Sequence, residues 1–348
     1  MRKKEFIFLL VKFGVFLLIA YVLWNEFSGL NFSTVVAHVQ QIGIASPLIF
    51  LPVLMMSLAD SQAWAACFIT GRRGFTFPEA FTFRVATDAL HNSLPAGVAV
   101  AETVRPMVAK RLLGVPYPDG IAAGIISKLN TAVTNLVFLI IGIVILAFFI
   151  GGNEPAGTAL GSPGLYVIGI IVVMAIGGLL WLPYRGTTFT ALRNFLLKIP
   201  VKQVHAYIEK HGASLLTLDA YIQTFTREHK SNLYKSIFLY LIGWFVTAFE
   251  TYIIVTLLGQ EITLLQAIAI ESSISFVRIV FFFLPAAVGA QEVGFLTLFT
   301  ALGIAEPVTT SAAFIFLRRS KEIVWIALGF GFFSTLKLNP FKPVLAQT

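Results

Sequence analysis

The sequence predicts an all-α polytopic integral membrane protein, and three observations support this fold class. Of the 348 residues, 57% are hydrophobic and only 12% are charged, whereas soluble domains carry about 25% charged residues. Apolar runs long enough to cross a bilayer, about 20 residues each, recur along the chain. A motif in the first half of the chain returns in the second half. We therefore expect one transmembrane domain, 1–348, with about seven full spans, two short or re-entrant helical segments and an inverted-topology repeat.

The first predicted span follows a basic N-terminus. Arg2, Lys3 and Lys4 precede the apolar run 6–24, an arrangement typical of a secretory signal peptide. No small-residue cleavage site follows the run and more spans come after it, so we interpret it as a retained first helix. Basic residues favour the cytoplasmic side of a membrane, which predicts a cytoplasmic N-terminus.

Hydropathy predicts the remaining spans, and basic residues orient them. These spans are 47–69, 120–149, 165–183, 237–258, 264–284 and 308–333. The turn at Arg72 and Arg73, the basic connection 184–236 and the C-terminus are predicted to be cytoplasmic, whereas the connection 150–164 has no basic residue and is predicted to lie outside. We interpret 184–236 as a membrane-surface loop with an interfacial helix near 189–197.

Two weaker segments, 75–94 and 285–303, are oriented by parity. The chain is inside at Arg73 and must be inside again before 120–149 can exit, so 75–94 and 95–114 must enter the membrane and return. They are predicted to be two short helices or a re-entrant pair. Re-entrant backbone is tolerated only where protein or a water-filled cavity surrounds it. By the same parity 285–303 runs outward and 308–333 returns inward.

The repeat appears when residues 94–128 are laid on 284–318 without a gap, which gives nine identities in 35 positions. In register are a proline (Pro95 and Pro285), an acid (Glu102 and Glu292) and a base (Lys128 and Arg318). Because the first copy is predicted to run in the opposite sense to the second, the repeat cores, 75–149 and 264–334, form an inverted repeat of the kind found in transporters. The alternative is a chance resemblance between two proline-kinked helices.

The repeated motif has a physical meaning. Proline breaks the helical hydrogen-bond ladder and small residues allow close approach, so the break can lie inside a protein-lined cavity. The helix that starts after the break presents free N–H groups and the positive end of its dipole. An acid in that stretch is stabilised by the dipole or can meet a cation. The motif therefore predicts a polar spot at membrane depth.

Ionisable residues inside the predicted spans recur at helical spacing. The groups are Arg84, Asp88 and His91; Glu102 and Arg105; Glu271, Ser275 and Arg278; and Arg318 and Glu322. Charged residues at depth usually face the bundle interior and mark function. Internal salt bridges that only position helices are the alternative for any one pair, but the number of groups favours a hydrated cavity. Asp60 and Glu250 stand alone in apolar spans and are interpreted as helix-packing polar groups.

Motifs of several other protein classes are absent from the sequence. There is no phosphate-binding Gly-x-x-x-x-Gly-Lys-Ser/Thr loop, no His-Glu-x-x-His, no Cys-x-x-Cys and no nucleophile elbow. We therefore expect a transporter-like protein with no cofactor, no metal site and no catalytic residues, and an intramembrane enzyme stays open as an alternative. The net charge of +8 is interpreted as a topology signal rather than as a sign of nucleic-acid binding.

The two motifs resemble those of the lysylphosphatidylglycerol synthase transmembrane (flippase-like) family. The first motif is carried by Pro95, Glu102, Arg105, Gly114-Val115-Pro116 and Lys128, and the second by Pro285, Gly289, Glu292, Gly303 and Arg318. The chain departs from the family pattern at Val100-Ala101, where two glycines are usual, and at Ser127-Lys128, where a Glu-Arg pair is usual. The run Arg318-Arg319-Ser320-Lys321-Glu322 with Trp325 is similar to the branch associated with hopanoid biosynthesis.

This resemblance implies movement of a lipid between leaflets by a stand-alone member that lacks the synthase domain. We expect a multi-pass protein of a bacterial cytoplasmic (inner) membrane with both termini in the cytoplasm. The expected ligand is a membrane lipid: a phospholipid, an aminoacylated lipid or a hopanoid. Arg105, Lys128, Arg278 and Arg318 are predicted to contact its head group, and Glu102, Glu271 and Glu292 to hold those cations or bind a cationic head. Arg84, Asp88, His91 and Glu322 are predicted to support them.

Two other function classes stay open at this point. One is a small-solute or proton-coupled transporter in which Asp88, Glu102 or Glu271 titrates. The other is a membrane scaffold that docks a lipid-synthesis enzyme through 184–236. A homo-oligomer is compatible with each of these functions.

Overall fold

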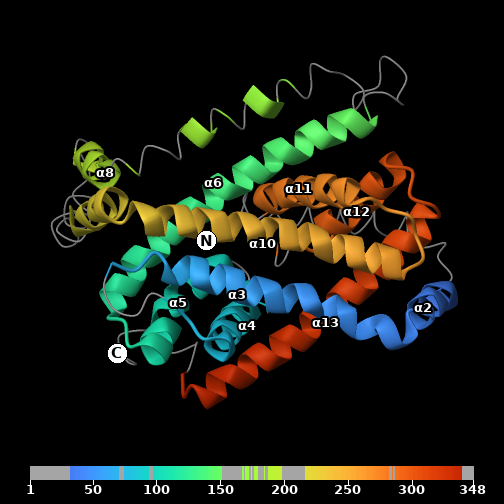
Figure 1. The fold of residues 1–348 in the computed structure, drawn as a ribbon, viewed down its shortest axis with the longest axis horizontal. Helices are drawn as coiled ribbons and strands as arrows, with labels where there is room; N and C mark the ends of the chain where they lie inside the picture. The colour runs from blue at the N-terminus through green and yellow to red at the C-terminus, as the bar shows by residue number, and fades with distance from the viewer. Residues whose placement is uncertain are drawn as a thin grey trace, which may run out of the picture.

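The computed structural model describes residues 32–69, 74–93, 97–150, 187–197, 216–281 and 287–338, with Leu284 and isolated positions between 167 and 184. Every element in the described residues is a helix (Figure 1), which confirms the predicted all-α class. In chain order the elements are α2 (Phe32–Gln41), η1 (Gly43–Phe50), α3 (Leu51–Ala65), α4 (Phe77–Ser93), α5 (Gly97–Leu113), α6 (Tyr117–Ile150), α8 (Thr188–Leu196), α10 (Lys230–Leu257), α11 (Leu264–Val280), α12 (Ala290–Ala301) and α13 (Pro307–Thr335).

Three helical stretches in the described residues are long and apolar enough to cross a membrane: Gly43–Ala65, Tyr117–Phe149 and Lys230–Leu257. They coincide with the predicted spans 47–69, 120–149 and 237–258. The predicted span 6–24 and most of 165–183 lie outside the described residues. Helices α11 and α13 occupy the predicted spans 264–284 and 308–333; α13 carries four charged residues at 318–322, which lower its apolar character.

The two weakly apolar segments are short helices. Segment 75–94 contains α4, and α5 begins at Gly97. Segment 285–303 contains α12, which has only 12 residues. Backbone of left-handed conformation precedes α12, at Ala287 (φ +46°) and Gly289 (φ +88°). Such backbone cannot continue a right-handed helix, so α11 and α12 are separate helices. Pro95 and Pro285 lie outside the described residues.

The repeat reaches one helix further than its predicted bounds. Two four-helix units have the same order of helices: α3–α4–α5–α6 and α10–α11–α12–α13. An offset of 190 residues places Ser57-x-x-Asp60-Ser61 on Thr247-x-x-Glu250-Thr251; five of these residues are buried, and Asp60 is partly buried. The starts of α4 and α11 also match, because the Thr76 N–H donates to Glu79 Oε2 (2.8 Å) and the Thr263 N–H donates to Gln266 Oε1 (2.8 Å).

Each unit packs one of its helices against the last helix of the other unit. Helix α4 of the first unit packs on α13 of the second, and α11 of the second unit packs on α6 of the first. Helices α3 and α10 lie side by side in opposite directions, and α6 and α13 also run in opposite directions (Figure 1). Equivalent helices that run in opposite directions are the arrangement that an inverted repeat requires.

Glycines make the two exchanged contacts close. A Cβ atom added at Gly142 in α6 would overlap the Ser272 side chain in α11, and one added at Gly329 in α13 would overlap the Val85 carbonyl and Ala89 in α4. Under the offset of 187 residues that relates α11 to α4, Ser272 is equivalent to Val85. Small residues at such crossings let helix backbones approach within a membrane, so these two glycines fix the spacing between the units.

We expect Gly142→Ala to destabilise the protein by about 1–3 kcal/mol, because the added methyl group collides with Ser272 at the α6–α11 crossing. The measurement is the Tm of the detergent-purified protein. The matched control is Gly124→Ala in the same helix, where a Cβ meets nothing within 4 Å in the described structure and Ala is the better helix former. Equal Tm values for the two variants would contradict the proposed contact.

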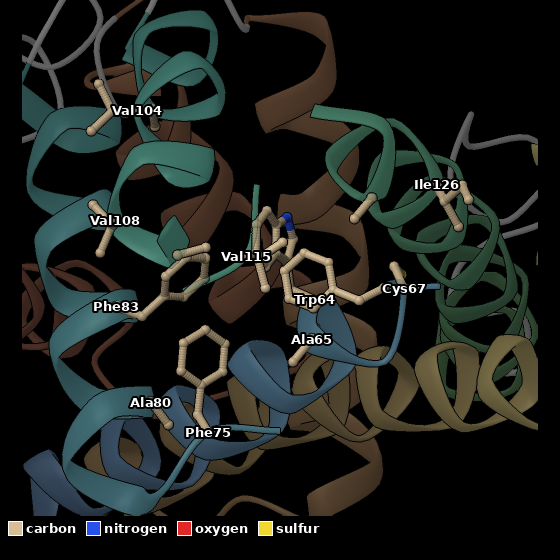
Figure 2. Close-up of a cluster of buried hydrophobic side chains, with 14 of the residues drawn as sticks. Trp64, Ala65, Cys67, Phe75, Ala80, Phe83, Val104, Val108, Val115 and Ile126 are labelled. Carbon is tan, nitrogen blue, oxygen red and sulfur yellow. The ribbon is translucent and has the colours of Figure 1, made fainter. Parts of the chain in front are cut away.

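Each unit has an apolar core of its own. In the first, Trp64 of α3 lies against Phe83 of α4, and Phe83 lies against Phe75, each pair with ring centroids 4.9 Å apart (Figure 2). In the second, Phe295 of α12 lies 4.7 Å from Phe314 of α13 between ring centroids. Aromatic pairs in these geometries add to the burial of apolar area. Each core ties together the helices that carry that unit's charges.

Candidate functional site

Ionisable side chains in the described helices form two clusters, one in each unit. The first cluster is Asp60 of α3, Arg84, Asp88 and His91 of α4, Glu102 and Arg105 of α5, and Lys128 of α6. The second cluster is Glu250 of α10, Glu271 and Arg278 of α11, Glu292 of α12, and Arg318, Arg319, Lys321 and Glu322 of α13. Each cluster joins all four helices of its unit.

One half of the first cluster is built around Arg84. Its guanidinium pairs with Asp60 across the α3–α4 contact and, through Nε at 2.5 Å, with Oδ2 of Asp88 one turn along α4. Gly243 of α10 leaves room for the Asp60 carboxylate, because a Cβ there would lie 2.5 Å from Asp60 Oδ1. One cation is therefore held between two acids where α3, α4 and α10 meet.

The other half of the first cluster is built around Glu102. Its Oε1 lies 2.8 Å from Nη1 of Arg105 in the same helix and 2.8 Å from Nζ of Lys128 in α6. His91, half-buried at the end of α4, interacts electrostatically with Arg105 and Lys128. Here one acid is held between two cations, the reverse of the Arg84 arrangement.

Glu271 is the centre of the second cluster, and its side chain is fully buried. Its carboxylate lies 2.5 Å from Nη1 of Arg318 and 2.8 Å from Nη2 of Arg278, and it accepts a hydrogen bond from the Thr251 hydroxyl at 2.6 Å. Arg278 also donates from Nε to Gln291 Oε1 of α12 at 3.2 Å. A buried carboxylate with three partners has its charge compensated and its acceptors occupied.

The remaining groups of the second cluster are paired as well. Arg319 donates to Glu292 Oε1 from Nε (2.9 Å) and Nη2 (2.5 Å) and to Glu322 Oε2 from Nη1 (2.6 Å). Lys321 pairs with Glu250, and both side chains are at most 5% exposed. The guanidinium of Arg318 also lies over the Phe295 ring, 5.2 Å from its centroid, which places this cluster against the second apolar core.

Glu292 occupies the position that the repeated motif predicts for an acid after a helix break. Its Oε2 accepts from the Gly289 N–H at 2.5 Å, in the first turn of α12. The N-terminal end of the helix dipole stabilises a negative charge there. Its equivalent, Glu102, lies in the second turn, because α5 begins at Gly97, and its Oε1 contacts two cations, Arg105 and Lys128.

The structure places the seven predicted binding residues in two separate groups. Glu102, Arg105 and Lys128 lie together in the first cluster, and Glu271, Glu292, Arg278 and Arg318 lie in the second. The predicted pairs Arg84–Asp88 and Glu102–Arg105 are present. Arg318 and Glu322 are four residues apart on α13, but it is Arg319 that pairs with Glu322, while Arg318 pairs with Glu271.

Asp60 and Glu250 do not stand alone in the structure, and their interpretation as helix-packing polar groups stays a prediction. Asp60 pairs with Arg84, and Glu250 pairs with Lys321 and lies 3.9 Å from Nε of Arg318. The residues that sequence reasoning left out of the site are therefore Asp60, Glu250, Arg319 and Lys321. The repeat would have identified the first two, since Asp60 and Glu250 are related by the same offset of 190 residues as Glu102 and Glu292.

Each cluster is balanced in formal charge. In the first, the three acids Asp60, Asp88 and Glu102 face the three bases Arg84, Arg105 and Lys128. In the second, the four acids Glu250, Glu271, Glu292 and Glu322 face the four bases Arg278, Arg318, Arg319 and Lys321. Balanced pairs lower the cost of holding ions away from water.

Comparison with known proteins gives one match. The family model described as the lysylphosphatidylglycerol synthase TM region matches residues 9–320. Neither the comparison with curated proteins nor that with solved structures gives a match.

Proposed function

The chain belongs to the lysylphosphatidylglycerol synthase transmembrane family, a family of multi-pass membrane proteins associated with membrane lipids, and from this premise we propose that it moves a lipid between the leaflets of a bilayer. The lipid would keep its tails in the bilayer while its head group passes along the charged clusters of the two units. We place the protein in a bacterial cytoplasmic membrane with both termini in the cytoplasm, as the basic residues favour.

The observation that carries the proposal is the pair of charge-balanced clusters, each of which includes residues of helices that are long and apolar enough to cross a membrane. The main barrier to lipid crossing is the transfer of a polar head into hydrocarbon, where each unpaired polar group costs several kcal/mol. Fixed cations and carboxylates offer the head group partners along its way. Ionisable residues inside a membrane are costly to bury, so their presence there usually indicates a function such as contact with a polar substrate.

The arrangement of the units supports the same proposal. Helices α3 and α10, and likewise α6 and α13, run in opposite directions, and each unit packs its second helix on the last helix of the other (Figure 1). Transporters with related halves open alternately to the two sides by moving one half against the other. The glycine crossings at Gly142 and Gly329 bring the two units close together, and such a movement would take place about them.

We expect Glu102→Ala and Arg318→Ala each to slow lipid translocation at least about tenfold, which corresponds to roughly 1.4 kcal/mol in the barrier. The measurement uses proteoliposomes with a fluorescent phospholipid and an external quencher that reports inward and outward movement. The control is Glu261→Ala, which removes an exposed acid in the connection between α10 and α11. Translocation at the wild-type rate in both cluster variants would refute the proposed function.

A further inference from the structure

The two clusters differ in how completely their cations are used. In the second cluster Arg318 contacts Glu271 and Glu250 and lies over two rings, Arg319 makes three hydrogen bonds to Glu292 and Glu322, and Arg278 contacts both Glu271 and Gln291. These guanidinium groups have partners on several sides. A ligand could bind them only by displacing existing partners.

The two cations that contact Glu102 have N–H donors that Glu102 does not occupy. Arg105 and Lys128 share a single carboxylate oxygen, Glu102 Oε1. The buried Nε of Arg105 has no hydrogen-bond partner among the described residues, although the side chain is only 11% exposed. An arginine and a lysine together carry more N–H donors than one oxygen can accept, and a buried donor without an acceptor is costly. This half of the cluster is therefore incomplete.

Lys128 is accessible as well as incompletely paired. Its side chain is 40% exposed, compared with 5% for Lys321 in the second cluster. Lys128 belongs to the membrane-length helix α6, and an ammonium group at that place is too costly to leave facing hydrocarbon. Its open side must face water or the polar part of another molecule. The local charge of Glu102, Arg105 and Lys128 is one negative and two positive, which leaves room for one anion.

We infer that the two clusters have different roles: Arg105 and Lys128 bind a phosphate group, whereas the second cluster locks α10–α13 together and is not the phosphate-binding site. This assignment rests on the proposed function, in which the phosphate belongs to a lipid head group. A phosphodiester carries one negative charge and matches the local excess. Its oxygens can accept from the free Nε of Arg105 and from Lys128 at once, as arginine and lysine commonly do with phosphate. Glu102 holds the two cations in place while the site is empty.

The test is native mass spectrometry of the purified protein with two probes, phosphatidylglycerol and uncharged diacylglycerol. We expect Arg105→Gln and Lys128→Gln each to lower the phosphatidylglycerol adduct at least about tenfold and to leave the diacylglycerol adduct unchanged. Arg111→Gln, an exposed arginine two turns along α5, is the matched control and should retain the adduct. Arg105→Lys preserves the charge and should retain part of the adduct, which separates loss of binding from loss of folding.

A variant of the second cluster is expected to behave in the opposite way, with loss of stability and no loss of lipid binding. Lys321→Met is expected to lower Tm and to leave the phosphatidylglycerol adduct of the folded fraction unchanged. If instead Lys321→Met abolishes the adduct while Arg105→Gln and Lys128→Gln keep it, the assignment of roles is overturned. The proposed function then still stands provided that the wild-type protein translocates lipid in proteoliposomes, and it fails on its own if the wild-type protein does not.

A free phosphate ion has the same chemistry as the head group, so a further measurement separates these two sources. Millimolar inorganic phosphate, compared with chloride at equal ionic strength, is expected to leave the wild-type Tm unchanged in the absence of lipid, because the site gains most of its affinity from the anchored lipid. A rise in Tm that Arg105→Gln abolishes, without any preference for phosphatidylglycerol over diacylglycerol, would assign the site to free phosphate and overturn the head-group inference.

Discussion

Glu271→Leu is expected to remove most of the folded protein. The substitution leaves Arg318 and Arg278 without the carboxylate that both contact, and Glu271 itself is fully buried. Breaking a buried ion pair by removing one partner costs about 3–5 kcal/mol, which is a large part of the roughly 5–15 kcal/mol that stabilises a native domain. The measurement is the monodisperse fraction in gel filtration together with Tm.

The matched control for Glu271→Leu is Thr251→Val. This variant keeps every charge of the second cluster and removes only the hydrogen bond from the Thr251 hydroxyl to Glu271, 2.6 Å long, which is worth about 1–3 kcal/mol because the acceptor is charged. Replacing Glu271, Arg278 and Arg318 together with leucines should be less harmful than Glu271→Leu alone, since no buried charge is then left unpaired. A Glu271→Leu protein with the wild-type Tm would show that the second cluster does not hold the unit together.

The helices themselves could be predicted because hydropathy and length report directly on the membrane. The predicted span 120–149 lies within α6, Tyr117–Ile150, and 237–258 overlaps α10 up to its last residue, Leu257. Segment 75–94 was recognised as helical through parity although it contains four ionisable residues that lower its hydropathy. Its boundary is marked by the bond between Thr76 and Glu79, a local feature that sequence patterns can identify.

Charge pairs within one helix could be predicted, whereas most pairs between helices could not. Glu102–Arg105 and Arg84–Asp88 follow from residues three or four apart on a helix. The pair Lys321–Glu250 joins residues 71 positions apart in sequence, and no local pattern indicates it. Its formation depends on how α13 packs against α10, which is a property of the whole fold.

The partners of the adjacent residues Arg318 and Arg319 also could not be predicted from the sequence. Successive residues on a helix point about 100° apart, so Arg318 and Arg319 must face different neighbours. The rotation of α13 about its axis decides which of them meets Glu271 and which meets Glu292 and Glu322. The contacts of Phe314 with Phe295 and Phe299 in the second core favour the observed rotation, and the spacing of residues within α13 does not show which arginine meets Glu322.

The internal repeat carried information about the site that remained unused. Asp60 and Glu250 are equivalent, and each pairs with a cation of its own unit. In the next helix of each unit, where the offset between α4 and α11 is 187 residues, the first unit has Arg84 and the second has Glu271. The same backbone arrangement thus holds a cation between two acids in one unit and an acid between two cations in the other. At this one position the related halves have kept an ionisable residue and exchanged its sign.

This exchange of signs leads to the second large prediction, that Arg84→Leu destabilises the protein by about 3 kcal/mol. Arg84 is the cation shared by Asp60 and Asp88, so its removal leaves two carboxylates close together with no positive charge between them. Repulsion between them adds to the cost of burying each one. Tm and chemical unfolding of the purified variant measure the loss.

Neutralising the two acids should restore stability if charge, rather than the size of the arginine, is what matters. We expect the triple variant Arg84→Leu with Asp60→Asn and Asp88→Asn to regain more than half of the lost free energy, because amides at these positions are uncharged and can still form hydrogen bonds. Asp88→Asn alone is the mild control, since Arg84 keeps its pair with Asp60. A triple variant as unstable as Arg84→Leu would mean that the α3–α4 contact depends on the packing of the arginine stem and that charge balance in the first cluster contributes little.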